Sequence, residues 1–206
     1  MTLVKICGIT NAEDAEFAVR SGADALGFNF YTGSPRYIDP LAARVIVKAM
    51  PAHIICVGVF VNEPLHSLVG QAIVSGVSTI QLHGDETPEF VREVKIESGL
   101  SVIKAFRVSP DFRPEDVLAY KADAILLDTY SPAAHGGTGE AFNWEIAAEV
   151  KEIFPKVYLA GGLGPSNVAE AIRIAAPYGV DACSLLESEK GRKNEKLVDE
   201  FVRNAQ

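Results

Sequence analysis

Eight short apolar runs recur along the chain, and a longer stretch with helical periodicity follows each of them. One of these runs, Ile54–Phe60, is apolar at nearly every position, which is typical of strands buried on both faces of a parallel sheet. The predicted strands are Leu3–Ile6, Ala23–Phe28, Ile54–Phe60, Ser78–Leu82, Ser101–Phe106, Ala122–Leu127, Val157–Ala160 and Val180–Cys183. Because the stretches between them are long enough for a crossing helix, the pattern predicts repeated βα units.

The stretches between these strands carry the start and stop signals of helices. Asn11 is a predicted N-cap for a helix over Ala12–Arg20. Further helices are predicted over Leu41–Ala49, after Glu63-Pro64, after Thr87-Pro88, and over Phe142–Phe154, Pro165–Ala175 and Arg192–Asn204. The stretch Ser109–Tyr120 contains two prolines, so we expect a truncated or irregular helix there.

The number of these units favours one architecture. Eight βα units without a break in composition predict an α/β fold of the (β/α)8 TIM barrel type, formed by residues 1–206 as a single domain. Such a barrel is small, because about 250 residues is typical of the fold. An open, doubly wound α/β sheet is the alternative arrangement.

Composition narrows the class of protein further. The chain has 206 residues, of which 48% are hydrophobic, which is enough to form a core and excludes global disorder. Its 19 Lys and Arg residues against 27 Asp and Glu residues give a net charge of −8, which argues against a nucleic-acid partner. The sequence has no apolar run of the ~18 residues that a membrane span needs and no signal-peptide pattern at its start, so we expect no membrane partner.

The cysteines bear on the cellular compartment and on metals. Cys7, Cys56 and Cys183 are far apart, and the sequence has no CxxC pair and no Cys/His cluster at zinc spacing. We therefore expect reduced thiols in a cytoplasmic protein, and no metal site. Cys56 and Cys183 are expected to be packing residues.

In TIM barrels the active site lies at the carboxyl ends of the strands, so the residues that follow each predicted strand are the candidates for chemistry. These residues are Cys7, Asn29, Asn62, His83, Arg107, Asp128, the turn Gly161–Gly164 and Ser184, with Ser34–Arg36 in the loop after the second strand. Gly161 and Gly162 let backbone N–H groups approach an anion, so this turn is a candidate phosphate site. The alternative is a tight turn that needs positive φ for structural reasons alone.

Two other polar segments have simpler interpretations. Gly136–Gly139 is expected to form a mobile loop at the active site. Neither it nor the turn at Gly161 matches the dinucleotide-binding pattern GxGxxG, and no cofactor is predicted. Glu187–Lys193 is expected to be a solvated loop before the last helix.

Cys7 and Asp128 are the strongest candidates for acid–base chemistry. Cys7 alternates with Lys5, so both side chains are expected to face the barrel interior, where a thiol near cations can ionise. A buried structural thiol is the alternative. Asp128 ends an apolar run, a costly place for a carboxylate unless it serves as a general acid or makes a cap or ion pair. The position of His83 fits a ligand contact and a structural hydrogen bond equally well.

Several motifs resemble those of one enzyme family. They are Val4–Thr10, Gly27–Phe30, Ser34–Ile38, Val57–Asn62, Gln81–Asp85, Leu126–Thr129, Gly136–Gly139 with Phe142–Trp144, and Ala160–Leu163. In their order, and over essentially the whole chain, these segments resemble phosphoribosylanthranilate isomerase of the tryptophan pathway. The resemblance implies a cofactor-free Amadori rearrangement of N-(5-phosphoribosyl)anthranilate to 1-(2-carboxyphenylamino)-1-deoxyribulose 5-phosphate.

The resemblance also implies a role for each site residue. Asp128 falls on the family's general acid, which protonates the furanose ring oxygen, and Cys7 on its general base, which removes the C2 proton. Arg36 falls on the residue that faces the anthranilate carboxylate. The expected substrate-binding residues are Arg36, His83, Gly161, Gly162, Ser184 and Leu185, with the phosphate held by backbone amides at Gly161-Gly162 and after strand eight.

One position departs from the family pattern. Leu185 stands where a glycine usually donates its N–H to the phosphate, and a leucine held at positive φ would cost about 1–2 kcal/mol. The alternative function is therefore a catalytically weakened phosphosugar-binding barrel with an altered loop after strand eight. In either case we expect a small phosphorylated substrate as the partner, and a monomer or a homodimer.

Overall fold

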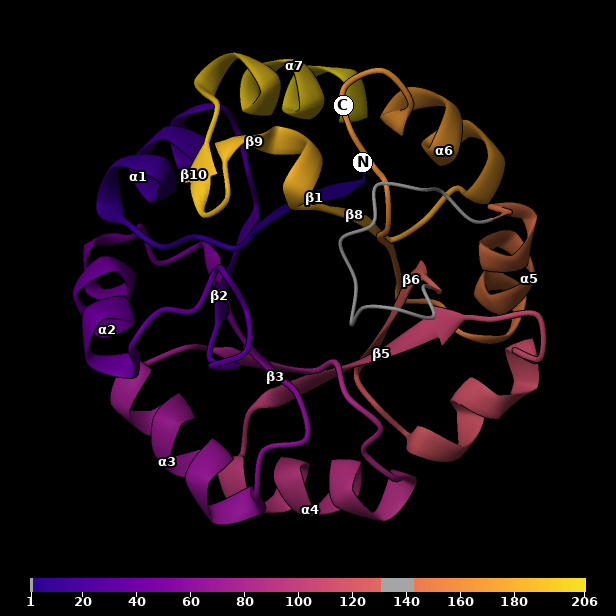
Figure 1. Ribbon diagram of the computed structural model, residues 1–206. Helices are drawn as coiled ribbons and strands as arrows, with labels where there is room; N and C mark the ends of the chain where they lie inside the picture. The colour runs from indigo at the N-terminus through magenta and orange to yellow at the C-terminus, as the bar shows by residue number, and fades with distance from the viewer. Residues whose placement is uncertain (1, 131–142) are drawn as a thin grey trace.

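The structure is a computed structural model that describes residues 2–130 and 143–206. Parallel strands form a closed barrel in the order β1 to β8, with β1 paired to β8, and helices surround it (Figure 1). The strands are β1 Leu3–Cys7, β2 Ala25–Asn29, β3 Ile55–Phe60, β4 Thr79–Leu82, β5 Ser101–Val108, β6 Ala124–Thr129, β7 Val157–Leu159 and β8 Gly179–Ala182. The predicted TIM barrel is confirmed, and the open doubly wound sheet is wrong.

The helices follow the strands as the sequence predicted. They are α1 Ala12–Arg20, α2 Pro40–Ala49, α3 Leu65–Ser75, α4 Pro88–Ser98, the 3-10 helix η1 Pro114–Tyr120, α5 Glu145–Ile153, α6 Val168–Ala175 and α7 Glu195–Ala205. The side chain of Asn11 caps α1 by accepting a hydrogen bond from the Asp14 amide at 2.9 Å. The irregular helix expected before the sixth strand is confirmed as η1.

Two predicted helix starts are wrong. Helix α6 begins at Val168, three residues later than expected, because Asn167 is tied to the preceding glycine turn. Its side-chain Nδ2 donates to the Gly162 carbonyl at 2.9 Å, and its Oδ1 accepts from the Gly164 amide at 2.9 Å. These bonds hold the turn at the end of β7 and delay the helix.

The last helix also begins later than predicted, because the segment before it is structured. A short 3-10 turn η2, Ser184–Leu186, leads into a hairpin of β9 Glu187–Glu189 and β10 Arg192–Lys193. The expectation of a solvated loop here is wrong, since the side chains of Glu187 and Lys193 are buried. The predicted loop Gly136–Gly139 and the predicted helix start at Phe142 lie outside the described residues.

Alternation along the strands separates two apolar cores. Outward-facing residues such as Ile6 and Ile125 pack against the helices. Inward-facing residues such as Val57, Leu126 and Tyr158 fill the barrel itself. At the carboxyl ends of the strands the inward positions become polar, so the fold directs these side chains into one space.

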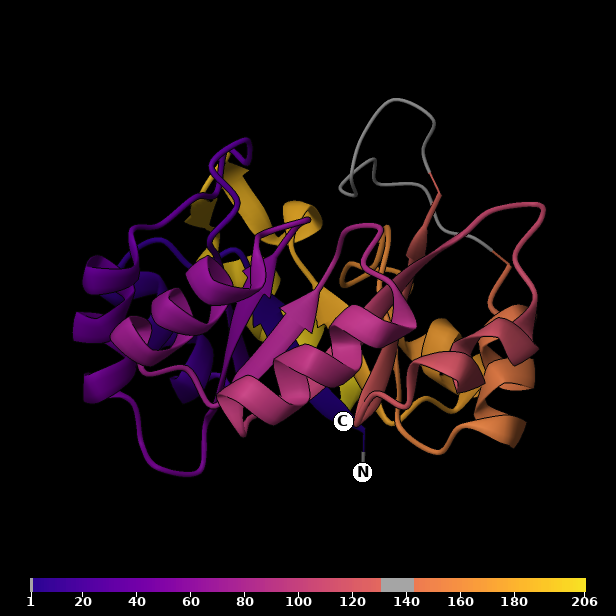
Figure 2. The ribbon, with the colours of Figure 1, turned by 90° about the horizontal axis from the view of Figure 1, so that it is seen from below.

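The two ends of the barrel differ. The β9–β10 hairpin and the loop after β2 rise on the side where the strands end, whereas the C-terminus lies at the opposite end (Figure 2). None of the helices that the structure describes is long and apolar enough to cross a membrane. The carboxyl end of the barrel is therefore the place to look for a site.

Candidate active site

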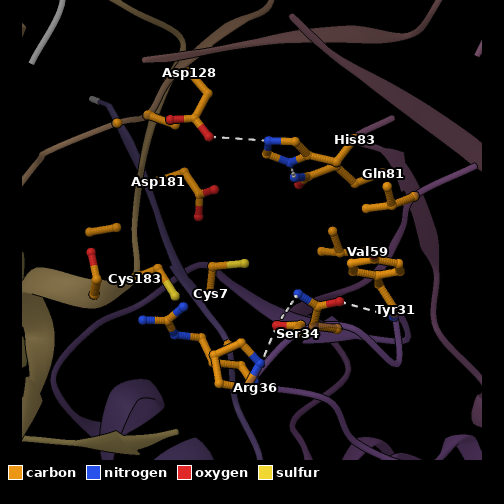
Figure 3. A pocket seen from close by; sticks show the side chains of 18 of the residues that line it. Cys7, Tyr31, Ser34, Arg36, Val59, Gln81, His83, Asp128, Asp181 and Cys183 are labelled. Carbon is orange, nitrogen blue, oxygen red and sulfur yellow. Dashed lines mark hydrogen bonds and ion pairs between the residues drawn. The ribbon is translucent and has the colours of Figure 1, made fainter. Parts of the chain in front are cut away.

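A cavity of about 370 Å³ opens at the carboxyl end of the barrel. Its floor and walls are inward positions of the strands and the residues that follow them (Figure 3). Of the predicted site residues, Cys7, Arg36, His83, Asp128, Gly161, Gly162 and Ser184 line this cavity. Leu185 does not. Asn62 and Arg107, which also follow predicted strands, do not line it either, and Arg107 is instead paired with Asp85. The structure thus brings together most, but not all, of the residues selected from the sequence.

Asp128 is held from two sides. Its Oδ1 accepts a hydrogen bond from the Thr129 amide at 2.8 Å, and its Oδ2 lies 3.1 Å from His83 Nε2. His83 Nδ1 in turn lies 2.9 Å from the side-chain nitrogen of Gln81. If the Gln81 amide donates to Nδ1, neutral His83 carries its proton on Nε2 and donates to Asp128. His83 therefore connects the carboxylate to β4 as well as lining the cavity.

Cys7 lies at the end of β1, on the inner face of the barrel, and is 9% exposed. The register that pairs Ile6 with Ala182 places Cys183 beside it, and Figure 3 shows both side chains on one side of the cavity. The pKa of the Cys7 thiol is well below its ordinary value because of a hydrogen bond from the Cys183 thiol. Burial opposes this shift, and the charges of Lys5 and Lys193 reinforce it.

The floor beneath Cys7 contains an ion pair. Lys5 Nζ lies 2.9 Å from Asp181 Oδ1, and both side chains are buried. Burial alone would lower the pKa of Lys5, but attraction to Asp181 and Cys7 holds it above its ordinary value. Burial raises the pKa of Asp181 to about 7, although attraction by Lys5 opposes this. The site thus holds a permanent cation and a carboxyl group that titrates near neutral pH.

Arg36 is fixed by the hairpin. Its Nε and Nη2 donate to the two carboxylate oxygens of Glu187 at 2.7 and 2.8 Å, and Lys193 Nζ lies 3.2 Å from the same carboxylate. This two-point pairing holds the guanidinium plane in one orientation. Among residues 2–130 and 143–206, only the Nε–Nη2 edge of Arg36 donates a hydrogen bond, so its Nη1 side can donate to an anion.

The turn after β7 is built for close approach by a ligand. Gly161 and Gly162 have φ values of +80° and +63°, a region that favours glycine. Their backbone N–H groups donate no hydrogen bond within the described residues, and the same holds for Ser184 and Leu185. The two loops therefore present unused donors that suit an anion.

The departure at Leu185 does not produce the expected strain. Among the described residues, positive φ outside glycine occurs at Asn62, Lys121 and Ala176, and not at Leu185. The Leu185 side chain is 40% exposed, and a Cβ added to Gly164 would lie 3.2 Å from its Cβ. Leucine at this position is thus accommodated outside the cavity.

Sequence reasoning did not select several residues of the site. Gln81 and Asp181 line the cavity. Each lies two residues before another lining residue, His83 or Cys183, and alternate residues of a strand face the same side, so this spacing could have identified both. Glu187 and Lys193 were not recognised as site residues, because a charged segment that contains glycine is typical of a solvent-exposed loop. No group of three or more His, Cys, Asp or Glu side chains among residues 2–130 and 143–206 is arranged to hold a metal ion.

Comparison with known proteins gives a consistent result. The family model described as N-(5'phosphoribosyl)anthranilate (PRA) isomerase matches residues 4–204. The N-(5'-phosphoribosyl)anthranilate isomerase of Trichlorobacter lovleyi is 48% identical over 205 residues, which cover 100% of this chain and 98% of the relative.

Solved structures agree. The crystal structure of phosphoribosyl anthranilate isomerase from Thermotoga maritima superposes with a TM-score of 0.92 at 41% identity, covering 100% of this chain and 98% of that one. A phosphoribosyl anthranilate isomerase in complex with reduced 1-(o-carboxyphenylamino)-1-deoxyribulose 5-phosphate has a TM-score of 0.89 at 40% identity, with the same coverage.

Proposed function

The chain belongs to the N-(5'-phosphoribosyl)anthranilate isomerase family, and we propose that Cys7 and Asp128 carry the two proton transfers of its reaction. The enzyme isomerises N-(5'-phosphoribosyl)anthranilate in tryptophan biosynthesis. The alternative of a catalytically weakened phosphosugar-binding barrel is not supported. The observation that carries the proposal is that a thiol of lowered pKa and a buried carboxyl group face the same cavity, beside unused backbone donors.

Asp128 acts as the general acid. Its Oδ1 accepts a hydrogen bond from the Thr129 amide, and its Oδ2 is paired with His83, which together orient the carboxyl group. Protonated Asp128 then donates to the furanose ring oxygen, and the ring opens to an iminium at C1.

Cys7 acts as the general base. As a thiolate it removes the proton from C2, next to the iminium carbon, and the resulting enolamine tautomerises to the ketone. The iminium makes the C2 proton acidic, so a base of modest strength suffices. The two transfers act on different atoms of the substrate, which is why the reaction needs two groups on different strands.

Substrate binding uses opposite ends of the cavity. The backbone donors of Gly161, Gly162 and Ser184 hold the phosphate. Arg36 presents its free Nη1 side to the anthranilate carboxylate, while Glu187 keeps its other edge in place. His83, directly after β4, contacts the substrate from that side of the cavity. Leu185 adds only its amide, because its side chain lies outside the cavity.

We also propose that residues 1–206 form one domain, since β1 and β8 pair to close the barrel. The free cysteines of the described chain fit a reducing, cytoplasmic environment.

The loss of anthranilate fluorescence on turnover tests the two roles. Cys7→Ala and Asp128→Asn should each lower kcat by roughly 10²–10⁴-fold with the fold retained. Cys56→Ala is the matched control, because it removes a buried thiol that packs against the helices outside the cavity. Turnover of Cys7→Ala near that of Cys56→Ala would contradict the base assignment. A rise in KM alone for Asp128→Asn would make Asp128 a binding residue.

A further inference from the structure

The buried Lys5–Asp181 ion pair has no step in the reaction described above. Its atoms are 2.9 Å apart, and the two side chains are 0% and 7% exposed. Desolvation of two charges is costly, so well-packed apolar residues of similar volume are often at least as stabilising as a buried ion pair. Stability therefore gives a weak reason for charges in the barrel core, and their position beneath Cys7 calls for another explanation.

Gly27 allows the Lys5 ammonium group to reach the thiol. Lys5 and Cys7 share the inner face of β1, and Gly27 of β2 is paired with Cys7. A Cβ added to Gly27 would lie 2.7 Å from Cys7 Sγ and 3.0 Å from Lys5 Nζ. Both atoms therefore converge on the space that a side chain at position 27 would fill, which places the charge next to the sulfur.

Other charges also face Cys7. They come from several elements: Lys5 of β1, Arg36 of the loop after β2, Asp128 of β6, Asp181 of β8, Cys183 after β8, and Glu187 and Lys193 of the hairpin. Arg36 and Lys193 share the single carboxylate of Glu187, which holds both cations on the hairpin side of the cavity. Cys183 contributes a hydrogen bond but is a neutral thiol, because its pKa is well above the ordinary value owing to its bond with Cys7 and to burial.

Lys5 differs from these cations in position. Its side chain is 0% exposed, and its ammonium group and the Cys7 sulfur approach the same space at Gly27. The charge of Lys5 acts on Cys7 through protein and not through water, which strengthens the interaction. Lys5 does not line the cavity, so it has no direct access to substrate.

We propose that Lys5, held in place by Asp181, is a positioning residue that keeps Cys7 ionised as the base. The inference rests on the proposed role of Cys7 in the reaction. When Cys7 accepts the C2 proton it becomes neutral, and Asp181 remains as the partner of Lys5. The ion pair thus lets the thiol change charge during turnover without leaving a buried ammonium group unpaired.

The pH dependence of alkylation tests this without relying on turnover. Each cysteine is alkylated with iodoacetamide over a pH series, and the modified peptides are quantified by mass spectrometry. Lys5→Met should move the Cys7 midpoint up by about one pH unit or more, and the acidic limb of the kcat/KM profile should move with it. Asp181→Asn should move the midpoint down, because it removes the carboxylate that competes for Lys5.

Lys104→Met is the matched control. Lys104 of β5 forms a similarly buried ion pair with Glu86, at 2.8 Å and 3% exposure on both sides, but it lies outside the cavity of Cys7. Its removal should leave the Cys7 midpoint unchanged. Cys56, whose pKa burial raises to about 11, serves as an internal reference in every sample.

Three results would overturn the proposal: an unmoved Cys7 midpoint in Lys5→Met, a shift in the same direction for Lys5→Met and Asp181→Asn, or an equal shift in Lys104→Met. If Lys5→Met does not fold, the test rests on Asp181→Asn. A lower midpoint pH for Cys7 alkylation in that variant supports the proposal, and an unchanged or higher midpoint refutes it. The proposed role of Cys7 as the base can fail independently of this proposal. In that case Cys7→Ala retains turnover, while the alkylation profiles still show whether Lys5 lowers the midpoint pH of Cys7.

Discussion

Replacing Gly161 with alanine should damage stability and catalysis together. Gly161 has φ +80°, a conformation that costs an alanine about 1–2 kcal/mol. The added Cβ would also lie 2.5 Å from the Thr129 amide nitrogen and 2.7 Å from Asp128 Oδ1. These atoms form a hydrogen bond of 2.8 Å with each other, so the methyl group would be forced against the bond that orients the carboxylate.

The magnitude follows from adding steric crowding to the backbone strain. Overpacking by a methyl group typically costs 1–3 kcal/mol, so the total for Gly161→Ala is roughly 2–5 kcal/mol. Relief requires movement of the strand-six backbone at Thr129 or of Asp128 itself. A displacement of about 1 Å at a reacting group can cost on the order of 10²-fold in rate, and we expect kcat/KM to fall by about that factor.

Gly99→Ala is the matched control. Gly99 ends α4 at φ +66°, and an added Cβ would meet no atom within 4 Å. This variant therefore carries the backbone strain alone, and should lose about 1–2 kcal/mol with unchanged activity. Urea denaturation and the anthranilate fluorescence assay measure the two quantities on both proteins. Equal stability losses, or activity of Gly161→Ala within a few fold of the parent, would refute the reasoning.

Variants at three further positions test other parts of the site. Cys183→Ala should raise the pH at which Cys7 becomes reactive to iodoacetamide, because the hydrogen bond to Cys7 is lost, whereas Cys183→Ser keeps an O–H donor and should stay closer to the parent. Glu187→Gln should raise KM by about tenfold, because Arg36 loses its charged partner. Burial would raise the pKa of Glu187, but hydrogen bonds and charge from Arg36 and Lys193 lower it, so its ion pairs stabilise the fold above about pH 4.3 and are lost as the pH falls further. The stability gap between parent and Glu187→Gln in urea should therefore shrink at about pH 3, and a constant gap would contradict this. Leu185→Gly should change the inhibition constant of inorganic phosphate by no more than about twofold, because Leu185 has no positive φ for glycine to relieve. A tenfold lower inhibition constant would contradict this, since it would mean that leucine holds the backbone of this loop away from the phosphate.

Much of the fold could be predicted because its signals are local. The alternation of residues along each strand decides which side chains face the barrel interior, and this holds whatever the neighbouring strand is. The inward position of Cys7 followed from that rule, and Asp128 was found because it ends an apolar run; both line the cavity. Helix N-caps such as Asn11 are equally local, since the cap and the amide it binds are three residues apart.

The charge network of the site could not be predicted in the same way. Arg36 and Glu187 are 151 positions apart, and Lys5 and Asp181 are 176 apart. They meet because the last strand closes on the first, with Lys5 paired to Asp181 in the register of β1 and β8. Nothing in the local sequence around Glu187 or Lys193 distinguishes a buried ion pair from a solvated loop.

The sequence by itself therefore determined the type of each element, the face that each strand residue presents and the ring of candidate residues at the carboxyl ends. The tertiary structure alone decided which of those residues became partners: Cys183 beside Cys7, Glu187 on Arg36 and Asp181 beneath the thiol. The physical reason is that side-chain direction is set by backbone period, within a few residues, whereas charge pairing depends on barrel closure and strand register, which join the two ends of the chain.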